Sequence, residues 1–432
     1  MSRGAEPSQG DYASAAEAMR ILRVRRQTLY AYVSRGWVRS IVQPGLKDKL
    51  YLRDDLVRLN MRSLARSGHG AVAASAMNWG EPILPTSITE ITPEGPRYRG
   101  HLAAELVNSG ASFEAVADLL WTGQLPDVAP HWPVHRPPLG MAAMTQGLSK
   151  QQTGSNLLEA FAAVILGLGL RRGSVADRMS GGQALVAARE IMQNLVSCCG
   201  FMGATKHYVP MRRNELLADA LMRALSIPPG SQNRTALQAI LILLADHELS
   251  PGTLTARVVA SAGGTLHSCL ASALCATSGL EVGRIYERVD DLLGLEPTTP
   301  RLISRARQLL AKGLSVPGFD HPAYPKGDPR AAQLLEFARN RQQTAQSRAI
   351  FRFIDQIHSI SGLLPRQELA VVVLTRAMGL PRQAALVLLA LARMAGWVAH
   401  VQEQRAAGTL LRPRAKFIDV PSGTTPNRAS PH

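Results

Sequence analysis

The chain has 432 residues and a mass of 46.6 kDa, which leaves room for roughly two or three domains of about 150 residues each. Hydrophobic residues make up 46% and charged residues 19% of it, a composition that excludes wholesale disorder and collagen-like repeats. The formal net charge is +16, and residues 20–66 alone hold twelve Lys and Arg against three acids. Such a local excess of cations indicates a module that binds a polyanion.

Nothing in the sequence predicts a membrane or secreted protein. The longest purely apolar run, residues 160–170, has 11 residues, fewer than the ~18 that suggest a bilayer span. The amino-terminal residues lack the apolar stretch of a secretory signal, so we expect a cytoplasmic protein. Four cysteines form no C-x-x-C pair and are expected to be small core residues, with no metal site: Cys198, Cys199, Cys269 and Cys275.

The cationic amino-terminal region has the pattern of a helix-turn-helix. Ser14 and Glu17 form a capping box that predicts a helix start. A second short helix should end at Gly36, and two strands should follow around a Pro44-Gly45 turn as a small wing. The segment SAAEAMRILRVRRQTLYAYVSRG resembles the DNA-binding head of MerR-like regulators, a resemblance that covers residues 12 to about 60. We therefore predict a MerR-like helix-turn-helix domain over residues 1–66.

The resemblance implies how this domain would contact DNA. The second helix would face the major groove, and the wing cations would contact phosphates. The alternative is a docking module whose arginines are only solvated. The candidate DNA-binding residues are Arg25, Arg26, Gln27, Thr28, Tyr30, Lys47 and Lys49.

Residues 67–80 are rich in Gly, Ala and Ser and predict a linker. Most of the chain beyond this linker has apolar residues at helical spacing, separated by Gly or Pro, so an all-α body is expected. Only TSITEIT and the last segment have an extended pattern. The helical patterns span residues 109–123, 155–169, 235–249, 255–279, 331–345, 367–379 and 381–401.

Seven ordered segments identify the body with a known family. They are TSITEITPEGPRYRG, SFEAVADLLWTGQLP, ADHEL, GFDHPAYPKGDPR, LPRQELAVVVLTRAMGLPR, LARMAGWVAHVQEQ and LRPR. Their order and spacing over residues 80–416 resemble citrate synthases, in particular the bacterial subset with a MerR-like head. The resemblance implies an all-α, citrate-synthase-like domain over residues 81–420, with a small domain at about 284–390. Residues 421–432 are rich in Pro, Ser and Thr and predict a disordered tail.

The oxaloacetate half of the family's site is largely present. Arginines must clamp the carboxylates, and an imidazole must polarise the keto group. The resemblance implies that His321 in GFDHP polarises the keto group and that four further residues bind the substrate: His247, Arg330, Arg393 and Arg412. In the family, the arginine matched by Arg412 reaches the active site of the other subunit, so a homodimer or a heterodimer with a homologue is implied.

The thioester half departs from the family pattern. The family's histidine that donates to the enol oxygen is replaced by Val282, which has no donor. The base Asp is replaced by Glu368, and the GFGH loop reads GFDH, with Asp320 in place of Gly. Glu281 cannot donate when ionised, and His267 in a neighbouring helix is the remaining alternative donor.

These departures favour impaired catalysis by a protein that still binds oxaloacetate or a similar dicarboxylate, and possibly an acyl-CoA. One alternative is an active citrate synthase that condenses acetyl-CoA with oxaloacetate to give citrate and CoA. The other is a DNA-binding metabolite sensor or a non-catalytic partner of an intact citrate synthase. No tightly bound cofactor is expected, since acetyl-CoA or a related thioester would be a substrate.

Overall fold

The computed structural model describes residues 12–22, 24–34, 38–42, 49–53, 55–56, 84–135, 157–172, 181–279 and 281–413. The chain divides into two compact units, Met1–Pro85 with Pro413–His432, and Thr86–Arg412. The predicted linker at 67–80, the tail at 421–432 and Lys47 lie outside the described residues.

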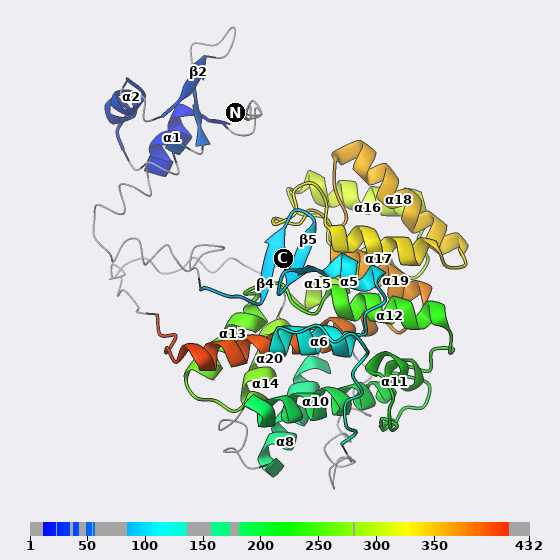
Figure 1. Ribbon diagram of the computed structural model, residues 1–432. Coiled ribbons are helices and arrows are strands. Elements are labelled where there is room, and N and C mark those ends of the chain that lie inside the picture. Colours follow the sequence, from blue (N-terminus) through cyan, green and yellow to red (C-terminus); the bar gives the residue numbers. More distant parts are fainter. Residues whose placement is uncertain are drawn as a thin grey trace, which may run out of the picture. The chain divides into compact units, whose positions relative to one another are not determined.

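The first unit combines two short helices with a three-stranded antiparallel sheet (Figure 1). The helices are α1 (Ala15–Leu22) and α2 (Arg26–Ser34), and the sheet has the order β1 (Tyr12–Ala13), β3 (Lys49–Leu52), β2 (Ser40–Val42). The Glu17 N–H donates to Ser14 Oγ over 3.3 Å, at the predicted helix start. A small core of Ala18, Leu29, Val38 and Tyr51 holds these elements together.

The second unit is mostly helical, as predicted, with one small antiparallel sheet of β4 (Thr89–Thr92), β5 (Gly95–Tyr98) and β6 (His101–Leu102). The described helices are α5 (Ala103–Asn108), α6 (Phe113–Thr122), α8 (Leu157–Arg172), α10 (Gly181–Cys198), η3 (Cys199–Phe201), α11 (Leu217–Ala224), α12 (Ser231–Leu243), α13 (Pro251–Ser261), α14 (Leu266–Thr277), α15 (Arg284–Leu293), α16 (Thr299–Ala311), α17 (Pro329–Arg339), α18 (Ala345–Ser361), α19 (Gln367–Ala377) and α20 (Ala384–Ala407).

Helix α20 runs through the middle of this unit, where α6, α10, α12, α13 and α14 pack around it (Figure 1). It is long and apolar enough to cross a membrane, but its apolar window is wholly buried inside the unit. Its composition is therefore accounted for by core packing, with Trp397 among the largest fully buried side chains.

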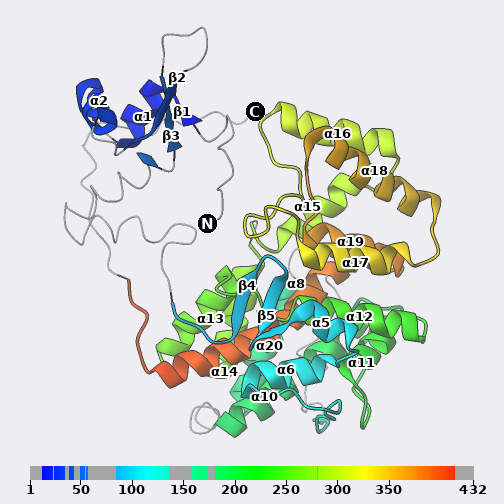
Figure 2. The ribbon, with the colours of Figure 1, turned by 45° about the horizontal axis from the view of Figure 1, so that its top comes forward.

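Helices α15 to α19 form a second group (Figure 2). In it α16 packs on α18, α17 on α19 and α15 on α19, and contacts of α12 with α17 join the group to the rest. The boundaries predicted for a small domain, 284–390, begin with α15 and end inside α20.

Two helical patterns are shorter than predicted. The pattern over 255–279 is two helices, because Gly263 with φ +79° ends α13 and α14 begins only at Leu266. The pattern over 235–249 ends at Leu243, so that His247 lies in a loop. Apolar spacing alone did not reveal either break.

Candidate active site

Three rings from two separate segments meet in one cluster. His247 lies in the loop between α12 and α13, and His321 and Tyr324 lie between α16 and α17. His247 Nε2 and Tyr324 Oη are 3.0 Å apart, and the ring centroids of the two histidines are 5.3 Å apart. The Ala323 N–H donates to His321 Nδ1 over 3.1 Å. When neutral, His321 therefore carries its proton on Nε2 and can donate from that atom.

The surroundings hold both histidines neutral. Burial and the positive charge of Arg330 lower the pKa of His321 to about 4. Burial, with Arg330 and Arg393, lowers the pKa of His247 well below its ordinary value. Burial raises the pKa of Tyr324 to about 12. At neutral pH the cluster therefore offers uncharged hydrogen-bonding groups between cationic neighbours.

A buried ion pair fixes the first arginine of the pocket. Arg330 is 2% exposed, and its Nε and Nη2 donate to Asp328 Oδ1 and Oδ2 over 2.9 Å each. The same carboxylate caps α17 by accepting the Arg330 N–H over 3.1 Å, and it accepts the Gln367 N–H over 3.0 Å. Asp328 thus orients Arg330 and joins α17 to the start of α19.

The second arginine is buried without such a partner. Arg393 in α20 is 7% exposed, and its Nη1 has no hydrogen-bond partner among the described residues. Burial lowers the pKa of Arg393, with nearby Asp246 opposing the shift and Arg330 adding to it. A buried N–H without an acceptor costs free energy, so this guanidinium is suited to receive an anionic ligand.

A glycine allows α20 to approach the segment that carries His247. A Cβ on Gly396 would lie 2.2 Å from Asp246 Oδ1 and 2.7 Å from the Ala245 carbonyl oxygen. The Gly396 N–H instead donates to that carbonyl over 3.1 Å. This contact holds Arg393, one helical turn away, beside His247.

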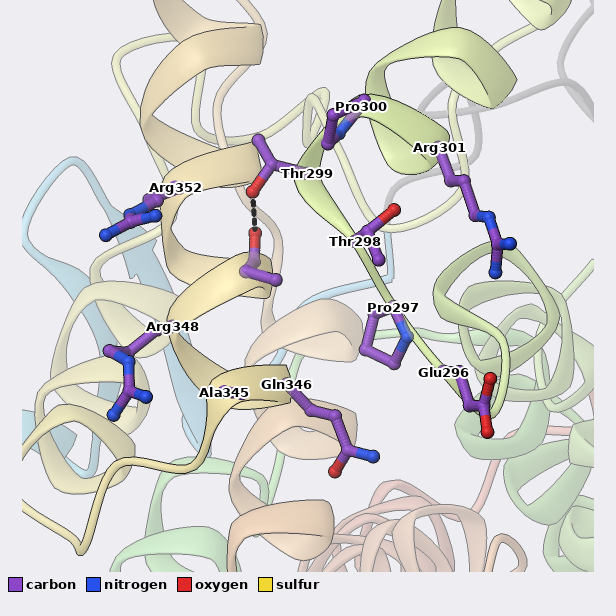
Figure 3. A pocket seen from close by; sticks show the side chains of 11 residues that line it. Glu296, Pro297, Thr298, Thr299, Pro300, Arg301, Ala345, Gln346, Arg348 and Arg352 are labelled. Carbon is purple, nitrogen blue, oxygen red and sulfur yellow. Dashed lines mark hydrogen bonds between the residues drawn. The ribbon is translucent and has the colours of Figure 1, made fainter.

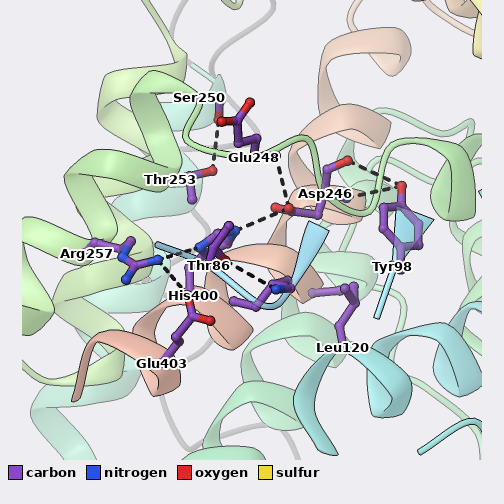
Figure 4. A network of polar contacts seen from close by, with 12 residues as sticks. Thr86, Tyr98, Leu120, Asp246, Glu248, Ser250, Thr253, Arg257, His400 and Glu403 are labelled. Carbon is purple, nitrogen blue, oxygen red and sulfur yellow. Dashed lines mark hydrogen bonds and ion pairs between the residues drawn. The ribbon is translucent and has the colours of Figure 1, made fainter. Parts of the chain in front are cut away.

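Behind His247, a polar network connects α13, α20 and the segment before β4 (Figure 4). His400 Nε2 lies 3.2 Å from Asp246 Oδ2, and its Nδ1 lies 3.2 Å from Arg257 Nη1. Arg257 donates to Glu403 over 2.7 Å, and Glu403 accepts from the N–H and hydroxyl of Ser87. Burial opposes ionisation of Asp246, but His400 lowers its pKa overall. The network fixes the residue that precedes His247.

The carboxylate of the predicted base accepts two hydrogen bonds from a neighbouring arginine. Glu368 lies in the first turn of α19, and its side chain is 8% exposed. Arg366, at the N-cap of the same helix, donates from Nη2 to Oε1 over 2.8 Å and from Nε to Oε2 over 3.1 Å. Both carboxylate oxygens of Glu368 therefore already accept hydrogen bonds from one guanidinium.

Among its described residues, the turn before α15 offers no side-chain donor at Val282, the position that was predicted to replace the family's histidine. The amides of Val282 and Gly283 both donate to the Gly279 carbonyl, over 3.2 and 3.0 Å. A Cβ on Gly283 would lie 2.4 Å from the Thr277 carbonyl oxygen, so this position needs glycine. The side chain of Val282 is apolar, and Glu281 is exposed.

The substitution at Asp320 has a structural explanation. Its φ is +53°, in the left-handed region that glycine favours and aspartate tolerates. Asp320 Oδ1 accepts the Leu364 N–H over 2.9 Å, and the Asp320 N–H donates to the Leu364 carbonyl over 2.8 Å. The loop that carries His321 is thereby joined to the segment before Glu368.

Not every predicted site residue has a contact that places it in this cluster. Arg412 is exposed after α20 and contacts none of the other predicted residues within the part of the chain that the structure describes. The alternative donor His267 packs against Gly169 of α8. Sequence reasoning missed Tyr324, Asp328 and Arg366, although each stands within three residues of a predicted site residue.

A separate cavity of about 960 Å³ lies between α16 and α18 (Figure 3). Its walls come from the start of each helix, where the Thr299 hydroxyl donates to the Ala349 carbonyl over 3.1 Å. None of the predicted site residues lines it; the lining includes Glu296, Arg301, Arg348 and Arg352.

The fold and the site define a mostly helical protein in which two neutral histidines, His247 and His321, lie close to two buried arginines, Arg330 and Arg393. The family model "Citrate synthase, C-terminal domain" matches residues 77–414. The chain therefore belongs to the citrate synthase family, as its sequence motifs predicted.

Individual relatives agree with this assignment. The chain is 27% identical over 345 residues to citrate synthase 2 of Bacillus subtilis, covering 77% of this chain and 92% of the relative. It is 25% identical over 350 residues to 2-methylcitrate synthase of Mycobacterium tuberculosis, covering 77% and 87%.

Solved structures share the fold. One is a ternary complex of citrate synthase from Thermoplasma acidophilum with carboxymethyl coenzyme A and oxaloacetate, with a TM-score of 0.67, 18% identity, and coverage of 80% of this chain and 96% of that one. Another is citrate synthase from Thermotoga maritima, with a TM-score of 0.61, 22% identity and the same coverage.

Proposed function

We propose that this protein binds oxaloacetate or a similar dicarboxylic 2-keto acid, and that it condenses this ligand with an acyl-CoA thioester at an impaired rate. The observation that carries the proposal is Arg393, a buried guanidinium with an unpartnered N–H among the described residues, beside Arg330 and the two neutral histidines. A ligand carboxylate would supply the acceptor that the described residues do not.

The groups of the pocket have complementary roles in this proposal. Arg393 and Arg330 hold the carboxylates, and His247 completes the pocket. His321 donates from Nε2 to the keto oxygen, a role that its accepted bond from Ala323 and its lowered pKa, about 4, support. Arg412 of a second subunit, in a homodimer or with a citrate synthase homologue, would close the pocket.

On the thioester side, Glu368 would take a proton from the α-carbon of acetyl-CoA or a homologue. Val282 gives no donor for the enol oxygen, and losing one such donor costs roughly 10²- to 10³-fold in rate. A carboxylate displaced by about 1 Å can cost roughly 10²-fold more. Turnover well below that of ordinary enzymes is therefore expected, with full citrate synthase activity as the alternative.

Two measurements test this proposal. Calorimetric titration with oxaloacetate should show binding by the unmodified protein, and a coupled assay should report slow release of free CoA from acetyl-CoA. Val282→His should increase the rate. Absence of oxaloacetate binding refutes the pocket assignment, and turnover by the unmodified protein of the order of 1 to 10³ per second refutes impairment.

We also propose that the first unit binds DNA, which would make the protein a metabolite-responsive regulator. Arg25, Arg26 and Gln27 are exposed at the start of α2, where the Arg26 Nε donates to Tyr30 Oη over 2.8 Å. The cations at the start of α2 therefore support binding of phosphates.

The salt dependence of DNA affinity tests this second proposal. Affinity should fall steeply between about 50 and 200 mM salt, because phosphate contacts release counterions. Arg25→Gln should weaken binding and reduce the slope, whereas Arg284→Gln removes an equal, exposed charge from the other unit and should not. No DNA binding, or equal effects of both variants, contradicts the assignment.

A further inference from the structure

Another side chain with a hydroxyl donor lies one helical turn beyond Val282. Tyr286 belongs to the first turn of α15 and is 2% exposed. Its hydroxyl donates to Gln367 Oε1 over 2.8 Å, across the contact of α15 with α19. Gln367 directly precedes Glu368, the predicted base. A buried phenol donor therefore lies at the contact of α15 with α19, next to the start of the helix that carries Glu368.

We propose that Tyr286 supplies the hydrogen-bond donor to the enolate oxygen that Val282 lacks. This inference rests on the proposed function, and it makes Tyr286 the catalytic residue on which the remaining condensation activity depends. The ligand class is the enolate form of an acyl-CoA thioester.

The charges around Tyr286 fit a donor that keeps its proton. Burial raises the pKa of Tyr286 above its ordinary value, and the negative charge of Glu368 raises it further, while Arg393 and Arg330 oppose the shift. The same three residues are the predicted base and the two arginines of the pocket. The Tyr286 phenol is therefore protonated at neutral pH. The charges of Glu368, Arg393 and Arg330 act on it.

The chemical step is a proton transfer without net gain or loss of electrons. Glu368 takes the α-proton of the thioester, and the electron pair of the broken C–H bond shifts so that negative charge develops on the thioester oxygen. This anionic oxygen is a stronger acceptor than the neutral Gln367 amide, so the Tyr286 O–H turns to it. The phenol keeps its proton. The enolate carbon then attacks the keto carbon of oxaloacetate, and the C=O π electrons move to the keto oxygen, which accepts a hydrogen bond from His321 Nε2 and takes up a proton in place of the one held by Glu368. Water then hydrolyses the thioester, which releases CoA.

The main chain of Gln367 is anchored, so this exchange of acceptors leaves the start of α19 in place. Its main chain is held independently of its side chain, because the Gln367 N–H donates to Asp328 Oδ2. Loss of the side-chain bond from Tyr286 therefore does not release the start of α19. The Tyr286 hydroxyl serves either the amide or the ligand, and α19 stays in place in both cases.

Carboxymethyl-CoA, whose carboxylate stands in for the enolate, is the probe for the test. Its affinity is measured with oxaloacetate present, alongside CoA release from acetyl-CoA and oxaloacetate affinity. Tyr286→Phe should weaken carboxymethyl-CoA binding about 10- to 100-fold and slow turnover by about 10²-fold, because one hydrogen bond to a charged group is lost. Oxaloacetate affinity should stay within about twofold of the unmodified protein.

Two further variants separate a catalytic from a structural role. Gln367→Leu removes the resting acceptor but keeps the donor, so carboxymethyl-CoA affinity should be retained. If Tyr286 only supports the fold, Gln367→Leu should reproduce the loss seen with Tyr286→Phe. Tyr208→Phe is the matched control, because Tyr208 also donates to an amide oxygen, that of Asn194 over 2.9 Å, away from the site.

The outcomes distinguish this inference from the proposed function. If oxaloacetate binds but Tyr286→Phe leaves carboxymethyl-CoA binding and turnover unchanged, the inference is wrong and the dicarboxylate pocket stands. If oxaloacetate binds and carboxymethyl-CoA does not, the inference is wrong as well. Absence of oxaloacetate binding by the unmodified protein overturns both.

Discussion

Replacing the two arginines of the site by an apolar side chain should change the free energy of unfolding in opposite directions. Arg330 is held by the buried carboxylate of Asp328, whose side chain is 0% exposed. Arg330→Met leaves that carboxylate without its cation. Removing one partner of a buried pair costs about 3–5 kcal/mol, so the free energy of unfolding should fall by about that amount.

Arg393→Met should stabilise the fold. Among the described residues Arg393 makes no ion pair within 4.0 Å, and its Nη1 is unpartnered. Relieving one unsatisfied buried group is worth about 1–3 kcal/mol. Asp246 loses the nearby charge of Arg393, which is destabilising, but it keeps its contact with His400, which limits that loss of stability. Both variants should lose oxaloacetate binding, since each removes a carboxylate contact.

Urea unfolding followed by tryptophan fluorescence measures the stability change, and calorimetry measures oxaloacetate binding. The expected difference between the two variants is about 4 kcal/mol or more, the smallest loss for Arg330 added to the smallest gain for Arg393. If Arg393→Met destabilises the protein as much as Arg330→Met does, Arg393 has a structural partner and the argument for a ligand site is wrong.

Three further changes test other parts of the site. Arg366→Gln should raise the rate of CoA release, because Glu368 loses the guanidinium that occupies both oxygens; an unchanged or lower rate contradicts this view. Gly396→Ala should destabilise the protein by about 3 kcal/mol or more through the contact at 2.2 Å, as urea midpoints would show, whereas Gly182→Ala, with nothing within 4 Å, should be nearly neutral. The contribution of His321 to stability should rise as pH increases from about 4 to about 6.5, because the folded state holds His321 neutral with a lowered pKa of about 4 while the unfolded chain still binds that proton. His321→Asn should flatten that rise, and an equally steep pH profile in this variant would argue against it.

The sequence predicted the residues of the histidine and arginine cluster because they lie in contiguous motifs. GFDHPAYPKGDPR alone carries His321 and Arg330, and the helical patterns located the element that holds Arg393. The protonation of His321 was not predictable, since it depends on a main-chain amide two residues along the loop that donates to the ring nitrogen. The loop position of His247 was also missed, because apolar spacing continues past the end of α12.

Side-chain pairing was the main limit on prediction. Arg366 and Glu368 are two residues apart, a spacing that does not place side chains on one face of a helix. They meet only because Arg366 stands at the extended N-cap of α19. Likewise, Tyr286 and Gln367 are 81 residues apart, and only the packing of α15 on α19 brings them together.

Two of the predicted departures from the family pattern, Asp320 and Glu368, lie in segments that are joined by hydrogen bonds. The Gly318 carbonyl accepts the Arg366 N–H over 2.8 Å, and Asp320 is hydrogen-bonded to Leu364 through both its main chain and its side chain. The loop with Asp320 and the segment that carries Arg366 and Glu368 therefore move together. Residues that share hydrogen bonds in this way do not contribute independently. The cost of either departure consequently depends on the other, so the two rate losses are not expected to multiply as independent effects.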